Sequence, residues 1–247
     1  MNDLKHAIAR RLVYVHNDWQ PVLIDALSEL EDTYLHFLET ADNYIPDKHG
    51  FLNAFQRLPM SKTRYILFGQ DPYPRRESAI GEAFIDGSAH SLWAPTGLSK
   101  EVNRATSLRN IMKMLLLAHE LVNPDKISQA TIARIDKSGL IQTIFDLRDN
   151  FVANGVLLLN TALVYSGKKD TAYHTSQWKP FVRSILRVLS PQTELILLGN
   201  FAVRYVGSLP EARYFEKAIF EHPFNISFVY SSKVQNFFKP MNLIYKR

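Results

Sequence analysis

A regular alternation between short buried segments and longer helical stretches is the strongest constraint on the fold of this chain. Four apolar runs of strand length each stop at a turn-forming or polar position: residues 62–68, 156–160, 194–198 and 218–220. Short runs of branched and aromatic side chains that end in this way are typical of buried strands. The sequence therefore predicts a sheet of four strands.

The segments between these strands carry apolar residues at helical spacing. They include residues 108–121, 140–151 and 178–189, the last closed by Pro191. The same spacing, with Pro21 near a helix start, predicts two helices between about residues 3 and 42. Strands that alternate with helices indicate a doubly wound α/β fold, with a mostly parallel four-stranded central sheet and helices on both faces.

Length and composition limit the number of domains and the kinds of site. A chain of 247 residues with 46% hydrophobic content suits one domain, so we expect residues 1–247 to form it, with residues 1–45 as an N-terminal helical segment. Cysteine is absent, which excludes disulfides, thiolate metal sites and a cysteine nucleophile. The eight histidines are scattered and form no HExxH-type cluster, so we expect no metal and no other cofactor.

The charge pattern bears on the partners of the chain. Lys and Arg total 29 against 24 Asp and Glu, an excess that is compatible with a polyanion such as DNA but does not require one. Charged residues interrupt every apolar stretch near the N-terminus, so none is long enough for a signal peptide or a membrane span. We expect a soluble monomer in the cytoplasm, with no membrane partner.

Polar residues follow all four predicted strands. Asp71, Asn160, Asn200 and His222 stand at or just after the strand ends. In open α/β sheets, ligands bind beyond the carboxyl ends of the strands. These residues therefore predict a site at one edge of the sheet that combines a carboxylate, amides and an imidazole.

Four sequence motifs, three of them at this predicted edge, follow one another along the chain. The first is Gly69-Gln70-Asp71-Pro72-Tyr73, in which Gly permits a tight turn and Pro fixes the backbone that presents the acid and the phenol. An Asp-Pro turn alone is common in proteins. Here, however, it is followed in order by Gly81-Glu82-Ala83-Phe84, Leu157-Leu158-Leu159-Asn160 and His222-Pro223. With these motifs the chain resembles the main family of uracil-DNA glycosylases from about residue 19 to residue 243.

The resemblance implies an enzyme of base excision repair. Such an enzyme flips uracil out of single- or double-stranded DNA, hydrolyses the bond between base and deoxyribose, and leaves an abasic site. By resemblance, Asp71 and His222 are the catalytic residues: Asp71 acts on the attacking water and the developing sugar cation, and His222 on uracil O2. A neutral imidazole can stabilise the departing base anion without protonating it.

The resemblance also implies the residues that bind the base and the DNA. Base-binding roles fall to Gln70, to Asn160, which reads the uracil edge, to Phe84, which stacks on the ring, and to Tyr73, which sits against C5 and excludes thymine. DNA-binding roles fall to Ile226, a wedge for the vacated position, and to Ser227, Ser107, Asn200 and Pro72. Taken singly, each of these residues has an ordinary explanation as a cap, a turn or core packing.

The chain departs from the family pattern in the loops that surround these motifs. Pro74 stands where the family generally has His, and Phe224 and Asn225 stand where it usually has Ser and Pro. Arg75 and Arg76 could supply backbone charge or form a plain solvated pair. Lys233 follows in a stretch that matches the family only loosely. We therefore expect intact base chemistry and altered DNA pinching.

Two other functions stay open from the sequence. One is a catalytically weak or inactive DNA-binding or interaction protein on the same fold, which the residues Pro74 and Phe224 would suit. The other is a nucleotide-binding protein, which is disfavoured because no GxGxxG or GxxxxGK[ST] loop follows a strand.

Overall fold

The centre of the fold is a four-stranded parallel sheet. The computed structural model describes residues 12–247, and in this part of the chain the sheet has the order β4-β1-β5-β6, with every neighbouring pair parallel. The strands are β1 (Tyr65–Gly69), β4 (Val156–Asn160), β5 (Glu194–Leu198) and β6 (Lys217–Phe220). The four predicted strands are thus confirmed, although β1 begins at Tyr65 because residues 60–62 form a 3-10 turn.

Alternate side chains of the strands enter two hydrophobic clusters on opposite faces of the sheet. One cluster includes Ile66 and Phe68 of β1, and the other includes Leu67 between them. Because both faces of the sheet are covered, the sequence of each strand is a continuous run of apolar residues rather than an alternation of apolar and polar ones. The sheet is therefore buried between two layers of helices, as the sequence predicted.

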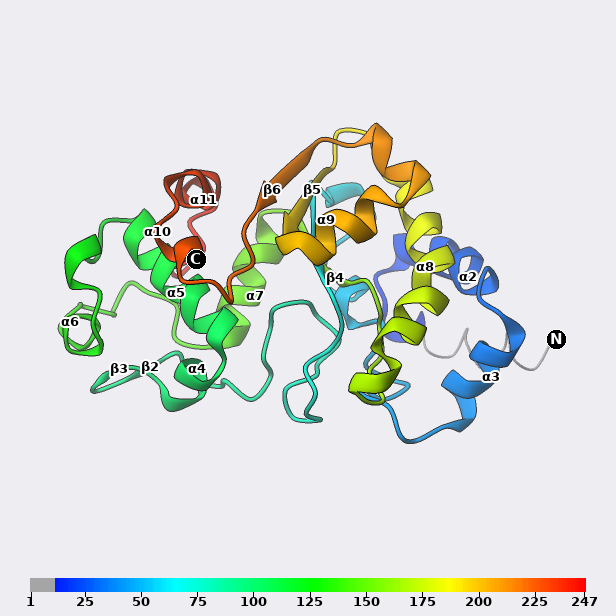
Figure 1. The fold of residues 1–247 in the computed structure, drawn as a ribbon, viewed down its shortest axis with the longest axis horizontal. Coiled ribbons are helices and arrows are strands. Elements are labelled where there is room, and N and C mark those ends of the chain that lie inside the picture. Colours follow the sequence, from blue (N-terminus) through cyan, green and yellow to red (C-terminus); the bar gives the residue numbers. More distant parts are fainter. Residues whose placement is uncertain (1–11) are drawn as a thin grey trace.

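Each layer combines helices from two separate stretches of the chain (Figure 1). The first layer consists of α2 (Gln20–Ser28), α3 (Asp32–Thr40), α8 (Thr171–Val188) and α9 (Gly199–Gly207). The second consists of α4 (Lys100–Arg104), α5 (Thr106–Ala118), α6 (Gln129–Ala133), α7 (Ile144–Ala153), α10 (Ser227–Tyr230) and α11 (Ser232–Phe238). The helices α2 and α3 and the position of Pro21 in the first turn of α2 agree with the prediction, whereas residues before 12 lie outside the described part.

Three helix boundaries differ from those expected. Helix α7 begins at Ile144 rather than at residue 140, because Thr143 and Asp146 form a reciprocal capping box that fixes the start. Helix α8 begins at Thr171, about two turns before the expected residue 178, and continues through Pro180. Helix α9 begins directly at Gly199, where the sequence predicted only a polar loop.

The loop at residues 88–100 contains a small hairpin of β2 (Trp93–Ala94) and β3 (Gly97–Leu98). Its tip bonds to α6, since Leu98 N–H donates to Oε1 of Gln129. The hairpin lies beside the second helix layer, at the far end from α2 and α3 (Figure 1). Among the described residues, no helix is long and apolar enough to cross a membrane.

Candidate active site

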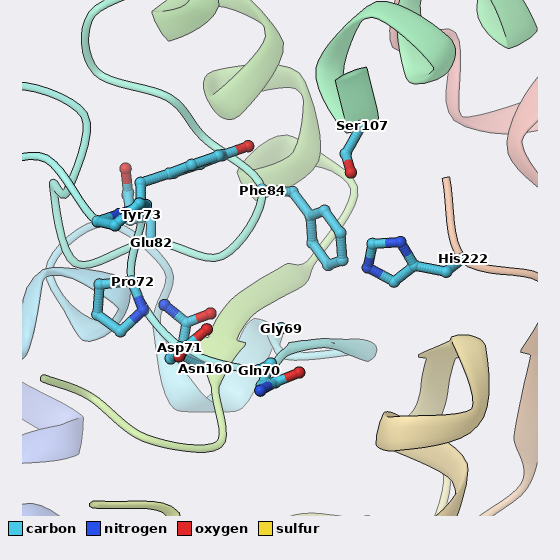
Figure 2. A pocket seen from close by; sticks show the side chains of 11 residues that line it. Gly69, Gln70, Asp71, Pro72, Tyr73, Glu82, Phe84, Ser107, Asn160 and His222 are labelled. Atoms are coloured by element: carbon cyan, nitrogen blue, oxygen red, sulfur yellow. The ribbon is translucent and has the colours of Figure 1, made fainter. Parts of the chain in front are cut away.

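The carboxyl edge of the sheet carries a cavity of about 280 Å³. Eight of the eleven residues predicted to act on base or DNA line it: Gln70, Asp71, Pro72, Tyr73, Phe84, Ser107, Asn160 and His222. Gly69, Pro74 and Glu82 complete the lining. Figure 2 shows the ring of Phe84 turned toward the imidazole of His222, while the side chains of Asp71 and Asn160 overlap in this view and that of Gln70 lies apart from them.

The ends of β1 and β4 fix the positions of the acid and the amide. Gly69 and Asn160 pair in register, and a Cβ on Gly69 would lie 2.2 Å from Oδ1 of Asn160. Only glycine therefore leaves room for this amide. Beyond the strands, Thr161 Oγ1–H and Ala162 N–H donate to the carbonyl of Gln70 at 2.7 and 3.0 Å, so the turn that follows β1 is tied to β4.

The Asp71 carboxylate is held by a residue that the sequence did not indicate. Thr171 Oγ1–H, at the start of α8, donates to Oδ2 of Asp71 at 3.0 Å. Burial raises the pKa of the Asp71 carboxyl above its ordinary value, and the hydrogen bond from Thr171 partly offsets that rise because it favours the charged form. This hydrogen bond fixes the orientation of a carboxylate that lines the cavity.

The imidazole of His222 is oriented by its own loop. The backbone N–H of Phe224 donates to Nδ1 of His222 at 3.1 Å, which assigns the ring proton of a neutral imidazole to Nε2. Burial lowers the pKa of His222, and this favours the neutral form. On the other side, a Cβ on Gly199 would lie 2.7 Å from Cβ of His222, so the close approach of α9 requires glycine here.

Phe84 is presented by an unusual backbone. Its φ is +63°, in the left-handed region that a bulky side chain rarely adopts, and Gly81 three residues earlier has φ +82°. A Cβ on Gly81 would lie 2.0 Å from the carbonyl oxygen of Gly50, and Ala83 N–H donates to the carbonyl of Leu158 in β4 at 3.1 Å. The segment is thereby anchored to the sheet, and its Phe ring lies 6.0 Å from the His222 ring between centroids. Strain that surrounding contacts maintain in this way is typical of functional sites.

Tyr73 lies at the cavity with its phenol buried, and burial raises the pKa of that phenol. The neighbouring Arg75 pairs with the buried carboxylate of Asp86 at 3.5 Å, so its charge already has an internal partner. Arg76 is exposed. Arg75 therefore has an internal ion pair, which is neither of the two roles considered from the sequence.

Glu82 is a cavity residue that the sequence reading missed. It is 8% exposed, and its Oε2 lies 4.0 Å from Nη1 of Arg148. Burial raises the pKa of the Glu82 carboxyl to about 7, although the charge of Arg148 acts in the opposite direction. A titratable group with a shifted pKa in a cleft is a candidate for function. Within residues 12–247, no three His, Cys, Asp or Glu side chains form a group that could hold a metal ion.

Three of the predicted DNA contacts lie outside the cavity. Ile226 is exposed on the loop after His222, and Ser227 Oγ–H donates to Oε2 of Glu221. Asn200 lines a second cavity of about 600 Å³, which also contains Lys233 and is bordered by His222. All three therefore flank the first cavity on the side of His222.

Comparisons with known proteins agree on one family. The family model described as Uracil DNA glycosylase superfamily matches residues 55–244. A uracil-DNA glycosylase of Campylobacter jejuni is 28% identical over 198 residues, which cover 77% of this chain and 72% of that protein. A uracil-DNA glycosylase of Fusobacterium nucleatum is 26% identical over 197 residues, covering 76% and 73% of the two chains.

Solved structures extend the similarity to the whole described fold. The wild-type UNG of Nitratifractor salsuginis superposes with a TM-score of 0.93 at 42% identity, covering 100% of this chain and 97% of that one. A tyrosine-to-glycine mutant of the same protein gives 0.95 at 43% identity, with 98% and 99% covered. The mimivirus uracil-DNA glycosylase shares the fold, with a TM-score of 0.55 at 16% identity over 86% and 71% of the two chains.

Proposed function

The chain belongs to the uracil DNA glycosylase superfamily, and we propose that it hydrolyses the N-glycosidic bond of deoxyuridine in DNA, releasing uracil and leaving an abasic site for base excision repair. The observation that carries this proposal is the single cavity lined by Asp71, Phe84, Asn160 and His222. These side chains supply a carboxylate, an aromatic face, an amide and an imidazole. Together they match what cleavage of a base from a sugar requires.

Asp71 acts on the sugar in this proposal. Cleavage passes through an oxocarbenium-like state, and a carboxylate near the anomeric carbon stabilises its positive charge and orients the attacking water. The hydrogen bond from Thr171 to Oδ2 orients the carboxylate and leaves it further lone pairs that can accept from water.

His222 acts on the departing base. As the bond breaks, negative charge collects on the base, and a neutral imidazole that donates from Nε2 stabilises the charge on uracil O2. Two observations support this role: the Phe224 N–H occupies Nδ1, and burial lowers the pKa of His222.

Asn160 and Phe84 recognise the base. A side-chain amide can accept from uracil N3–H and donate to O4, whereas cytosine presents the reverse pattern. Phe84 stacks on the ring, and Gln70, which lines the same cavity, also contacts the base. Tyr73 bounds the cavity on the side assigned to C5, where a thymine methyl would clash.

DNA contacts form around the mouth of the cavity in this proposal. Ile226 enters the vacated position in the duplex, and its exposed side chain, 57% accessible, supports that role. Ser107, at the first turn of α5, and Asn200, at the first turn of α9, donate to phosphates, as does Ser227 after release from Glu221. Pro72 is mostly buried, so its part is limited to the cavity wall that it shares with Asp71.

The reaction is monofunctional, since the residues that line the cavity include no lysine to act as a Schiff-base nucleophile. The substrate is uracil-containing DNA, either single- or double-stranded, and flipping of the base precedes cleavage in the duplex. The monomeric state, the cytoplasmic location and the single-domain organisation of residues 1–247 stay predictions.

Uracil release is the direct test of this proposal. Oligonucleotides with one uracil are incubated with the protein and then treated with alkali; we expect strand breaks at the uracil only after alkali. Asp71→Asn is the matched variant, because the amide oxygen can still accept from Thr171 while the charge is lost. It should lower the rate by orders of magnitude and still bind DNA. A wild-type protein that binds DNA but never yields alkali-sensitive sites would instead support the alternative of a binding protein.

A further inference from the structure

Two large apolar side chains project from the loop that follows His222. Phe224 is 66% exposed and Ile226 is 57% exposed, whereas Pro223 and Phe228 in the same segment are buried. A single exposed apolar residue needs no explanation, but two of them two positions apart, in the loop that follows the cavity residue His222, indicate a contact surface.

The backbone beneath these side chains is held in place. Asn110, buried in α5, donates through Nδ2 to the carbonyl of Pro223 at 2.7 Å. Asn225 N–H donates to the carbonyl of His222 at 2.9 Å, and Phe228 N–H donates to the carbonyl of Asn225 at 3.2 Å. The loop backbone is therefore ordered while the Phe224 ring stays in solvent. The conformational entropy of fixing this backbone is thus already lost before a partner binds.

The charge of the loop limits what this partner contact can be. Residues 221–230 contain no Lys or Arg, and their one charged side chain is Glu221. Such a surface offers an anionic phosphate no cationic side chain, only neutral donors such as the Ser227 hydroxyl, whereas the apolar faces of bases can pack on it. The loop thus offers aromatic and aliphatic contact with bases and no positive charge for the DNA backbone.

We propose that Phe224 is a second DNA wedge beside Ile226, which stacks on a base flanking the vacated position and so holds the duplex open over the cavity. The proposal rests on the uracil-releasing function above. Ile226 fills the gap, and Phe224 covers the base face that flipping exposes. The backbone N–H of Phe224 bonds His222, so the ring that stacks on the DNA and the imidazole that faces the base are fixed by the same residue.

The two parts of Phe224 can be separated by substitution. Phe224→Ala removes the ring and keeps the N–H, and the exposure of the ring means that folding does not depend on it. We expect kcat/KM for uracil in duplex DNA to fall by about 10- to 100-fold, the loss that corresponds to one base–aromatic stack. Uracil in a single strand has no pair to hold open, so its kcat/KM should change by less than about 3-fold. Phe224→Trp, which keeps an aromatic ring at this position, should have a kcat/KM on duplex DNA close to that of the wild type.

Tyr214→Ala is the matched control. Tyr214 is a similarly exposed aromatic, 61% accessible, but it precedes β6 instead of following it and therefore lies toward the opposite edge of the sheet. It should leave both substrates unaffected. Equal losses on duplex and single strand for Phe224→Ala, or no loss on either, would overturn the wedge while leaving the proposed function intact. The proposed function itself fails only if the wild-type protein releases uracil from neither substrate.

Discussion

Glu82 makes the stability of this protein depend on pH in a way that can be calculated from its surroundings. Its carboxyl is almost fully buried, and its pKa is raised from the ordinary 4.5 to about 7. The folded state therefore binds a proton that the unfolded state has already lost over this pH window. By linkage, the free energy of unfolding falls as the pH rises from 4.5 to about 7, and the full loss of stability is present above pH 7.

The perturbation that isolates this effect is Glu82→Gln, which keeps the shape and removes the titration. Each unit of pKa shift corresponds to about 1.36 kcal/mol. As the pH is raised from about 5 to about 8, the free energy of unfolding of the variant should therefore increase by roughly 2 to 3 kcal/mol relative to that of the wild type. Urea denaturation followed by tryptophan fluorescence at several pH values measures the difference. The buried carboxylate is close enough to Arg148 that this figure already includes their attraction.

Asp149→Asn provides the control for this experiment. Asp149 bonds the same Arg148 at 2.9 Å, but its side chain is 56% exposed. An exposed ion pair contributes less than about 1 kcal/mol. The Asp149 charge is the smallest of the contributions to the raised pKa of Glu82, so this variant should keep the direction of the wild-type pH dependence and reduce its size only slightly. A constant difference between Glu82→Gln and the wild type across the pH range would refute the reasoning, because it would mean that Glu82 is ionised equally in both states.

Two further predictions concern the cavity. Thr171→Ala removes the hydrogen bond that lowers the Asp71 pKa, so the acidic limb of the profile of kcat/KM against pH should move to higher pH. The maximal rate should fall by about 10-fold. The control Thr175→Ala loses only a hydrogen bond within α8 and should change neither quantity. Tyr73→Ala should permit thymine release from T:G mispairs while uracil release persists, as measured by alkali-sensitive sites at thymine; absence of any thymine release would mean that another wall residue excludes the methyl group.

Part of this structure was predictable because local sequence determines it. The four strands are buried on both faces, so each is a run of apolar residues whose end is visible in the sequence as a turn. Parallel pairing then brings their carboxyl ends to one edge, which is why Asp71, Asn160 and His222 could be grouped before the fold was known.

Other parts depend on contacts that no local pattern encodes. The bond from Thr171 to Asp71 joins residues 100 positions apart and requires α8 to start at Thr171, in a polar stretch with little apolar periodicity. Glutamate is a residue type usually found on the surface. Glu82 is buried because the Gly81–Phe84 segment is anchored against β4. Helix α9 was missed since Gly199 and Asn200 favour turns, and only the approach of His222 explains the glycine.

The departures of the loop from the family pattern are compatible with an intact reaction for a specific reason. The group that fixes the His222 tautomer is the main-chain N–H of residue 224, and every amino acid except proline supplies that donor. Phe can therefore replace the usual Ser without changing the imidazole, while its side chain changes what the loop offers to DNA. Under the proposed roles, selection can act on the two functions of this position separately, because the proposed catalytic one resides in the backbone and the proposed DNA-binding one in the side chain. The same logic places the sequence differences of this chain in its loops and leaves Asp71 and Asn160, whose roles depend on side-chain chemistry, unchanged.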